Sequence, residues 1–233
     1  MKNLLIFMLT MVLFFSLTPF SYAIPIDNLD GTITDSDTGL MWLQDANHAM
    51  GRFDFNPDDG LMRFFSFSEF LAQMNAGNIS GGNFGYTDWR LPTTLQPDPR
   101  CSSQFGGSSF GFNCTGSEMG NLFYIGLGNA AGGPLTNTGP FLNLQPGFFW
   151  SSTQTDPINP SVVWGFNFND GQQQQNNRFG YGLLVRDAGP AVVPEPGTLL
   201  LVGSGLAALA ALRRRFHSAV SQVGAGSSPP AVR

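Results

Sequence analysis

The C-terminal end of the chain limits which residues can fold as a domain. Three features follow one another there: Pro194-Glu195-Pro196, an apolar run at residues 198–212, and Arg213-Arg214-Arg215. Prolines interrupt regular structure, and arginines after an apolar helix fix its inner end at a membrane. As a helix, residues 197–212 would span roughly 24 Å, less than the ~30 Å hydrocarbon core of a bilayer. The sequence therefore predicts a short membrane helix after the folded domain.

The N-terminal end carries a second apolar segment. Lys2 precedes an apolar run at residues 4–17, and Ser21-Tyr22-Ala23 supplies the small residues that a signal peptidase prefers. We therefore expect residues 1–23 to be a secretory signal peptide, with signal peptidase as a partner. An uncleaved anchor is the alternative, but the apolar run is short for one. The predicted domain occupies residues 24–193, which is long enough for one substantial core.

The charge of this domain excludes one class of partner. Residues 24–197 contain all 16 acidic residues of the chain, six arginines and no lysine. Nucleic-acid binding requires basic patches that displace counterions, so nucleic acid is not an expected partner. An acidic surface is explained by solubility outside the cell or by bound cations.

The chain has two cysteines, Cys101 and Cys114, which enclose a segment rich in glycine and serine. In the oxidising compartment to which a signal peptide leads, this pair predicts a disulfide worth about 2–3 kcal/mol. A metal site would require more ligands nearby.

The 29 glycines and 16 prolines predict short elements joined by long loops. Capping-box patterns at residues 66–69 and 115–118 predict two helices, which end at Gly77 and near Gly126. Aromatic and β-branched runs predict strands in antiparallel sheets, so the fold class is α+β with two short helices. The predicted β elements are an opening hairpin at 33–43, strands at 148–151, 162–168 and 181–186, a turn at Asn169-Asp170-Gly171, and an exposed hairpin loop at 172–177.

Several distinctive residues have a structural interpretation. The four tryptophans are expected to anchor the core, because large aromatic residues dominate burial in a domain with few Leu and Val. Arg90 beside Asp88 and Arg186 beside Asp187 are expected to form ion pairs that organise loops. We also expect Ser151-Ser152-Thr153 to close a turn and His48 to lie on a polar surface. The tryptophans are Trp42, Trp89, Trp150 and Trp164.

Four blocks of sequence resemble the Lcl C-terminal domain family. They are DNLDGTITDSDTGLMW (27–42), GYTDWRLPT (85–93), FFWSST (148–153) and YGLLVRD (181–187). The resemblance implies a sulfatase-modifying-factor-like or C-type-lectin-like fold, related to the formylglycine-generating enzyme, over residues 27–187. Segment 52–65 and the loop between the cysteines are insertions relative to that family.

The C-terminal features, in their order from residue 193 to 215, resemble a PEP-CTERM sorting signal. This resemblance implies export across the inner membrane and cleavage by an exosortase in bacteria that produce exopolysaccharide. Residues 216–233 form an atypical tail, because members of the family usually end soon after the arginines. An ordinary C-terminal anchor is the alternative.

We expect no catalytic activity. The related fold includes a copper-dependent oxidase that acts through cysteine, but a disulfide leaves no reactive thiolate. His48 is the one histidine of residues 24–193, and HExxH does not occur, so a catalytic triad or a zinc hydrolase would lack its base or its ligands. A carboxylate pair such as Asp58-Asp59, or Glu118 with an aspartate, is what a glycosidase would require.

Two kinds of binding site are considered. Four aspartates near the start of the domain are hard oxygen ligands suited to Ca²⁺, although Asx turns explain them without an ion. Two triplets, at 96–98 and 168–170, resemble the calcium- and galactose-binding QPD and WND sequences of C-type lectins, although both are also ordinary turn sequences. The candidate residues are Asp27, Asp30, Asp35 and Asp37 for calcium, and Gln96, Asp98, Asn169 and Asp170 for sugar.

Together these features indicate an exported surface or matrix protein with a non-catalytic ligand-binding module, for which the resemblance of the fold to lectins suggests a glycan as ligand. Its partners would be polysaccharide or envelope proteins, and the loops at 101–114 and 172–177 are the expected recognition surfaces. One alternative is a structural exopolysaccharide or biofilm component without a ligand pocket. The other is a carbohydrate-active enzyme.

Overall fold

The computed structural model describes residues 24–52, 59–79, 81–155 and 162–189. The predicted signal peptide, sorting signal, short membrane helix and tail lie outside these residues, so their boundaries stay predictions. In the described ranges, none of the helices has the length and apolarity needed to cross a membrane.

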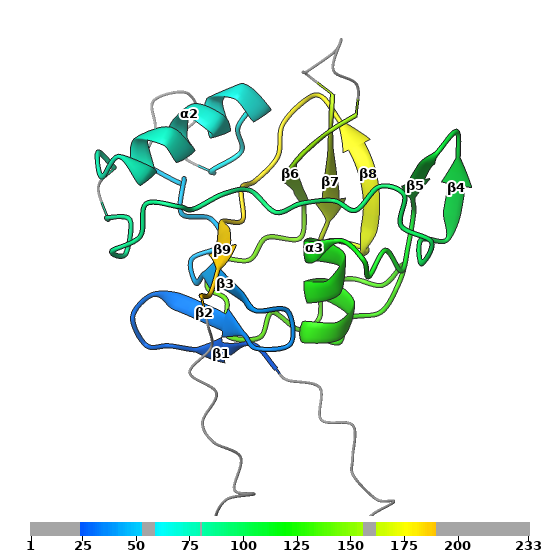
Figure 1. The fold of residues 1–233 in the computed structure, drawn as a ribbon, viewed down its shortest axis with the longest axis horizontal. Helices are drawn as coiled ribbons and strands as arrows, with labels where there is room; N and C mark the ends of the chain where they lie inside the picture. Colours follow the sequence, from blue (N-terminus) through cyan, green and yellow to red (C-terminus); the bar gives the residue numbers. More distant parts are fainter. Residues whose placement is uncertain (1–23, 53–58, 80, 156–161, 190–233) are drawn as a thin grey trace, which may run out of the picture. The chain divides into compact units, whose positions relative to one another are not determined.

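The first sheet contains both ends of the described domain (Figure 1). It is antiparallel with the strand order β1-β2-β3-β9, and the predicted opening hairpin is confirmed as β2 and β3. The C-terminal strand returns to pair with β3, which places Val185 opposite Trp42. The strands are β1 (Ile26–Asp27), β2 (Thr32–Asp35), β3 (Leu40–Leu43) and β9 (Val185–Asp187).

The second sheet is antiparallel, with the order β6-β7-β8, and a separate hairpin consists of β4 and β5. The predicted turn at 169–171 joins β7 to β8, with Gly171 at a φ of 84° that favours glycine. The turn predicted at 151–153 is wrong, because these residues lie within β6, at an irregularity in its pairing with β7. These strands are β4 (Ser103–Phe105), β5 (Ser108–Phe110), β6 (Phe148–Gln154), β7 (Val163–Asn167) and β8 (Gln172–Asn176).

The prediction of an exposed loop at 172–177 is also wrong. This segment forms β8, which pairs along β7 from Gln172 to Asn176. Its other edge bonds to Gly111, and Gln173 is only 1 % exposed. Glutamine has a weak strand preference, so here the pairing of both edges determines the structure.

The two predicted helices are confirmed, which completes the α+β class. Helix α2 (Phe64–Asn75) ends as expected, with Gly77 at a φ of 76°. Helix α3 (Glu118–Asn121) continues into the π-helical turn η1 (Leu122–Gly126). Both capping boxes are wrong: Ser66 lies inside α2, and α3 begins at Glu118 with Ser117 rather than Thr115 at its N-cap and no side-chain capping bond.

Strand β3 has both faces buried, and each face contributes to a different apolar core. Leu40 and Trp42 pack in the first core, with η1 and β7. Met41 and Leu43 pack in the second, with α2. Because side chains alternate along a strand, this four-residue segment belongs to both cores at once. The described domain is thus built around an internal strand.

The tryptophan prediction is confirmed, and the histidine prediction is wrong. The four tryptophans are at most 3 % exposed. His48 is 2 % exposed rather than on the surface, because its ring lies edge-on to Phe70 and Phe84. Its Nδ1 is 3.8 Å from the carboxylate of Asp45.

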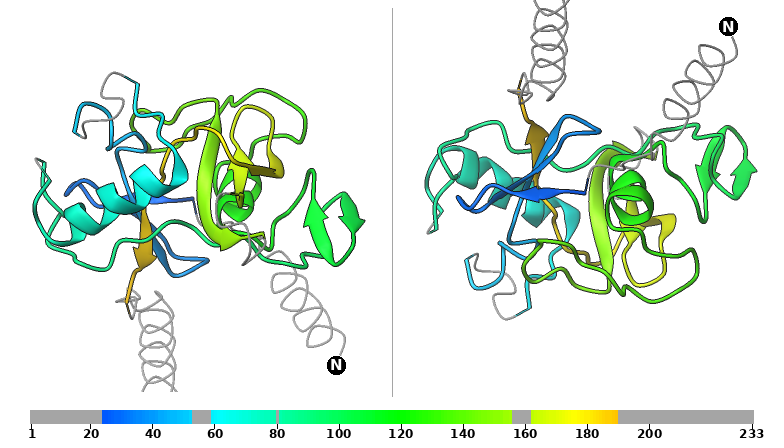
Figure 2. Two further views of the ribbon diagram at one scale, coloured as in Figure 1. Left: turned by 90° about the horizontal axis from the view of Figure 1, so that it is seen from above. Right: turned by 90° about the horizontal axis from the view of Figure 1, so that it is seen from below.

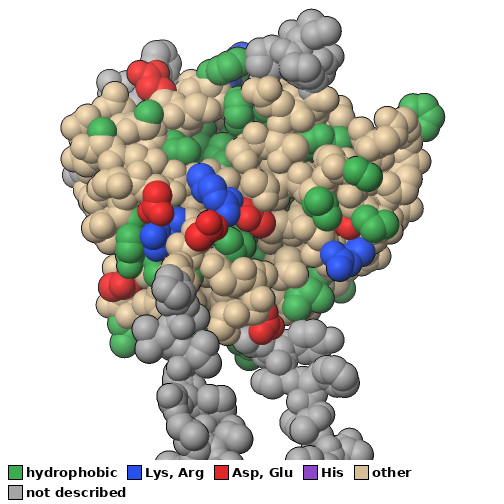
Figure 3. Space-filling model, viewed as in Figure 1, with side chains coloured by type: hydrophobic (Ala, Val, Ile, Leu, Met, Phe, Trp, Pro, Cys, Tyr) green, Lys and Arg blue, Asp and Glu red, His purple; other side chains and the backbone are tan. Residues whose placement is uncertain are grey.

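Both arginines form ion pairs as expected, but with exchanged partners. The guanidinium of Arg90 makes two hydrogen bonds, of 2.8 and 2.9 Å, to Glu118, and a third to Asp187. Arg186 bonds to Asp88 and lies 4.0 Å from the ring centre of Tyr86. Figure 3 shows acidic and basic side chains next to one another in the middle of the face that it views. The Arg90–Glu118 and Arg186–Asp88 pairs connect residues 28 and 98 positions apart. The residues next to each arginine in the sequence therefore do not identify its partner.

We predict that Arg90→Met lowers the free energy of unfolding by about 2–3 kcal/mol, because it leaves the largely buried carboxylate of Glu118 without its cation. Urea denaturation monitored by tryptophan fluorescence measures this change. Arg100→Met, at an exposed arginine, is the matched control and should change stability by less than about 0.5 kcal/mol. Equal effects of the two substitutions would contradict a role for the ion pair.

Two carboxyl groups predict a loss of stability in acid. Burial raises the pKa of Asp45, but hydrogen bonds from His48 and Asn143 outweigh it, so this pKa is lowered. Hydrogen bonds from Arg186 lower the pKa of Asp88. A lowered folded-state pKa stabilises the protein above the unfolded-state value of about 3.9, and this stability disappears as the pH falls through the folded-state value.

The urea midpoint should therefore stay constant from about pH 7 to pH 5 and fall below about pH 4. Asp88→Asn removes one of the two groups, so its midpoint should fall less steeply over the acid range. An acid dependence identical to that of the wild type would exclude the Asp88 pair as a contributor.

Candidate functional site

The predicted disulfide is present between Cys101 and Cys114, which are 13 positions apart. The hairpin of β4 and β5 lies inside the loop that this bond closes. It projects from the body of the domain on the side opposite α2 (Figures 1 and 2). A hairpin of three-residue strands is marginal by itself, so its position depends on the groups that attach it to the rest of the domain.

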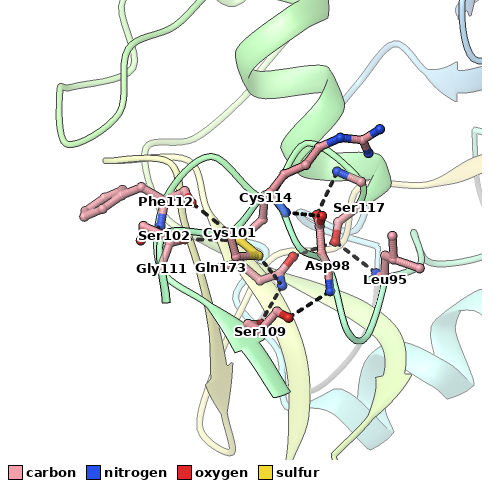
Figure 4. Close-up of a disulfide and its surroundings, with 12 residues drawn as sticks. Leu95, Asp98, Cys101, Ser102, Ser109, Gly111, Phe112, Cys114, Ser117 and Gln173 are labelled. Carbon is pink, nitrogen blue, oxygen red and sulfur yellow. Dashed lines mark hydrogen bonds between the residues drawn. A yellow bond between two sulfur atoms is a disulfide. The ribbon is translucent and has the colours of Figure 1, made fainter. Parts of the chain in front are cut away.

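A buried polar network attaches the hairpin (Figure 4). Its centre is Ser109, which is fully buried and whose backbone N–H donates to the side chain of Gln96 at 2.7 Å. The carbonyl of Ser109 accepts bonds from the amides of Gln96 and Gln173 at 2.8 and 2.9 Å. The Ser109 hydroxyl accepts the N–H of Asp98 at 2.8 Å. Polar groups at this depth remain favourable only because they bond to one another.

Asp98 carries a carboxylate that is fully buried. One of its oxygens accepts the backbone N–H of Gly116 at 2.7 Å, and the other accepts that of Arg100 at 3.0 Å. These N–H groups replace the water that the charge loses on burial. The loops before and after the disulfide are thereby joined through one side chain.

Strand β8 completes the attachment. Gln173 and Gly111 exchange two backbone hydrogen bonds of 2.8 and 2.9 Å. The hydroxyl of Ser117, at the start of α3, donates to the side-chain oxygen of Gln173 at 2.6 Å. The two segments expected from the sequence to be recognition surfaces, 101–114 and 172–177, are therefore in direct contact.

A pocket of about 310 Å³ opens between the hairpin and the second sheet. Its floor includes Trp164 of β7, which is 3 % exposed, and its wall includes Phe105, which is 81 % exposed. In Figure 3 the hairpin ends in an apolar side chain, and the surface toward β8 is apolar or uncharged. The lining residues are Phe105, Ser108, Phe110, Trp164, Gln174 and Gln175.

The aspartates considered for calcium lie in or beside the turns of the first sheet, and three of them accept hydrogen bonds of the Asx-turn type. Asp27 accepts the N–H of Leu29, and Asp30 that of Thr32. Asp35 accepts the N–H of Asp37. Within the ranges that the structure describes, no three acidic, histidine or cysteine side chains are grouped to hold a metal ion.

The two lectin-like triplets have different roles in the structure. Gln96 and Asp98 belong to the network that attaches the hairpin. Asn169 and Asp170 form the turn between β7 and β8, where Asp170 accepts the N–H of Gln172. The Asp170 side chain thus stabilises local backbone, as ordinary turn residues do, whereas Gln96 and Asp98 bond to segments 13 and 18 residues away.

Sequence reasoning identified the two segments of the pocket but not its lining. Phe105, followed by two glycines, was a usable signal, because a large aromatic residue in a glycine-rich hairpin has little core to enter. Trp164 gave no such signal, since it has the burial of a core residue. The side chains of Gln174 and Gln175 become significant only because β8 lies beside the hairpin.

Removal of the disulfide should lower stability without unfolding the domain at room temperature. We predict that Cys101→Ser with Cys114→Ser reduces the free energy of unfolding by about 3 kcal/mol, the entropy of a loop of this length. Urea denaturation of the oxidised wild type, the reduced wild type and the double variant measures the difference. The last two should coincide, and a midpoint equal to that of the oxidised protein would show that the hydrogen bonds alone position the hairpin.

The C-terminal segment matches the PEP-CTERM protein-sorting motif over residues 192–215. This motif is processed by exosortase, so the chain is exported and located at the cell envelope or surface. The sorting residues Pro194, Glu195, Pro196, Arg213, Arg214 and Arg215 lie in the matched range.

The described domain matches the model of the Lcl C-terminal domain over residues 31–186. No curated protein and no solved structure matches the chain. The matched range includes strands β2 to β8, the first two residues of β9, both helices and the disulfide hairpin, and it covers more than half of the chain. The chain belongs to the Lcl C-terminal domain family.

Proposed function

We propose that this exported protein is a non-catalytic binding module that holds a polysaccharide segment in the pocket beside the disulfide hairpin. The observation that carries the proposal is the combination of an exposed aromatic ring, Phe105, with the side-chain amides of Gln174 and Gln175 in one pocket.

The lining of the pocket suits the two kinds of surface that a sugar ring presents. The C–H faces of a pyranose are apolar and pack on aromatic rings such as those of Phe105 and Phe110. Sugar hydroxyls both donate and accept hydrogen bonds, and a glutamine amide does the same. Binding pockets typically combine an apolar lining with a few polar groups of this type.

The same lining supports a binding role over a catalytic one. Hydrolysis of a glycosidic bond requires an acid and a second carboxylate or base at the bond. The six lining residues include no titratable side chain. The buried His48, which neighbours the half-buried Asp45, packs on Phe70 of α2, and α2 lies on the side of the domain away from the hairpin (Figure 1).

The two ends of the described domain belong to a different sheet from the pocket. Residue 24 and residue 189 both adjoin the turn between β2 and β3: β1 pairs with β2 near Thr34, and Ala188 bonds to Gly39. The pocket belongs to the other sheet and to the hairpin. Neither end of the described domain lines the pocket.

We predict that Phe105→Ala weakens polysaccharide binding by about tenfold or more, because the ring supplies the exposed apolar wall of the site. The measurement is affinity electrophoresis of the exported protein through gels that contain soluble polysaccharides. Phe65→Ala is the matched control: Phe65 is 55 % exposed and lies on α2, across the domain from the pocket.

Both variants should keep the free energy of unfolding of the wild type within about 0.5 kcal/mol, since both rings are exposed. If polysaccharide gels retard the wild type and Phe105→Ala equally, the pocket is not the polysaccharide-binding site. A wild type that binds no polysaccharide would support a purely structural matrix component instead.

A further inference from the structure

Charged residues are distributed unequally between the two halves of the domain sequence. Residues 24–100 contain fifteen charged side chains, and residues 101–177 contain three: Glu118, Asp156 and Asp170. The second segment supplies all six residues that line the pocket. A long exported segment with so few charges indicates a surface whose partner is uncharged as well.

The two charged residues of this segment that the structure describes do not line the pocket, and both make hydrogen bonds within the domain. Glu118 is 18 % exposed in its side chain and bonds to Arg90. Asp170 accepts the N–H of Gln172 in the turn at the far end of β8. Asp156 lies outside the described residues. The pocket therefore presents rings, amides and a hydroxyl to its ligand.

These groups discriminate between neutral and anionic sugars. A carboxylate or sulfate is bound tightly by arginine, lysine or converging N–H donors, which compensate its lost hydration. Against the negative faces of Phe105 and Phe110 it would instead be desolvated without compensation. A hydroxyl carries no such cost, because each amide offers it both a donor and an acceptor.

The backbone of β8 also offers hydrogen-bond donors and acceptors in equal number at the edge facing the hairpin. Gln173 directs its N–H and C=O toward the hairpin, where both bond to Gly111. Alternation along an antiparallel strand directs the backbone N–H and C=O of Gln175 toward the same edge, at the pocket. One donor beside one acceptor again fits a hydroxyl and not an anion.

Two exposed arginines, Arg100 and Arg178, flank these segments in the sequence, but neither lines the pocket. Attraction of an acidic polysaccharide to them would be a surface effect, and salt would screen it. This difference in salt dependence separates recognition in the pocket from adsorption to the surface.

We infer that the pocket selects neutral polysaccharide chains and discriminates against uronic-acid and sulfated ones. The inference rests on the proposed polysaccharide-binding function and specifies the substrate class of that site. Selection arises from hydroxyl recognition by Gln174 and Gln175 against a wall of phenylalanine rings.

Isothermal titration of the exported protein tests this inference. The probes are neutral oligosaccharides of glucan, mannan and xylan type, and anionic oligosaccharides of alginate and heparin type, at about 0.05 M and 0.5 M salt. We expect neutral chains to bind with the same affinity at both salt concentrations, and at least one of them to bind about tenfold more tightly than any anionic chain.

Substitution of one lining residue supplies the second readout. Gln175→Lys should raise the affinity for alginate or heparin fragments about tenfold at low salt, because it places a cation in the pocket. Gln172→Lys is the matched control, since it adds the same charge to β8 at a residue that does not line the pocket. It should leave both affinities unchanged.

Two results would contradict the inference in different ways. If the wild type binds anionic chains and no neutral ones, and Phe105→Ala abolishes that binding, the proposed function stands and the neutral selectivity is wrong. If neither class of chain binds, the proposed function itself fails. Equal responses of Gln175→Lys and Gln172→Lys would exclude the pocket as the source of selectivity.

Discussion

Burial of both faces of β3 is the constraint on which the rest of the structure depends. Trp42 points into one core and Leu43 into the other, and both are fully buried. The C-terminal segment repeats this arrangement, with Leu183 in the first core and Leu184 in the second. A shift of either segment by one position would move each of its side chains from one core to the other. The register of these strands is therefore strongly determined.

The two cores fix the sheets, but they leave the long loops to polar side chains. In a loop-rich domain, buried backbone groups must find partners outside regular ladders. Glu118 shows the principle: the carboxylate that was expected to cap its own helix instead accepts the N–H of Thr93 and two bonds from Arg90. The hairpin is held in the same way, through Asp98 and Gln173.

This division explains which features were predictable from the sequence. The opening hairpin, the strand containing Trp164, the turn at 169–171 and the end of α2 at Gly77 were predictable, because local alternation or a positive φ determines each. Strand β8 was not, because a run of glutamines becomes a strand only when β7 and Gly111 pair with its edges. The partners of Arg90 and Arg186 were likewise determined by contacts between distant segments.

The candidate site also combines a part that the sequence predicts with a part that depends on contacts between distant segments. Trp164 could be assigned from sequence to the core, and it is buried, but one side of it is also the floor of the pocket. The wall comes from a hairpin that is attached by a disulfide and a polar network rather than by either apolar core. A recognition surface attached in this way can change in sequence without disturbing the two cores. That independence is physically possible because the disulfide and Gln173 carry the attachment, so Phe105 and its neighbours at the tip contribute little to stability and are free to serve binding.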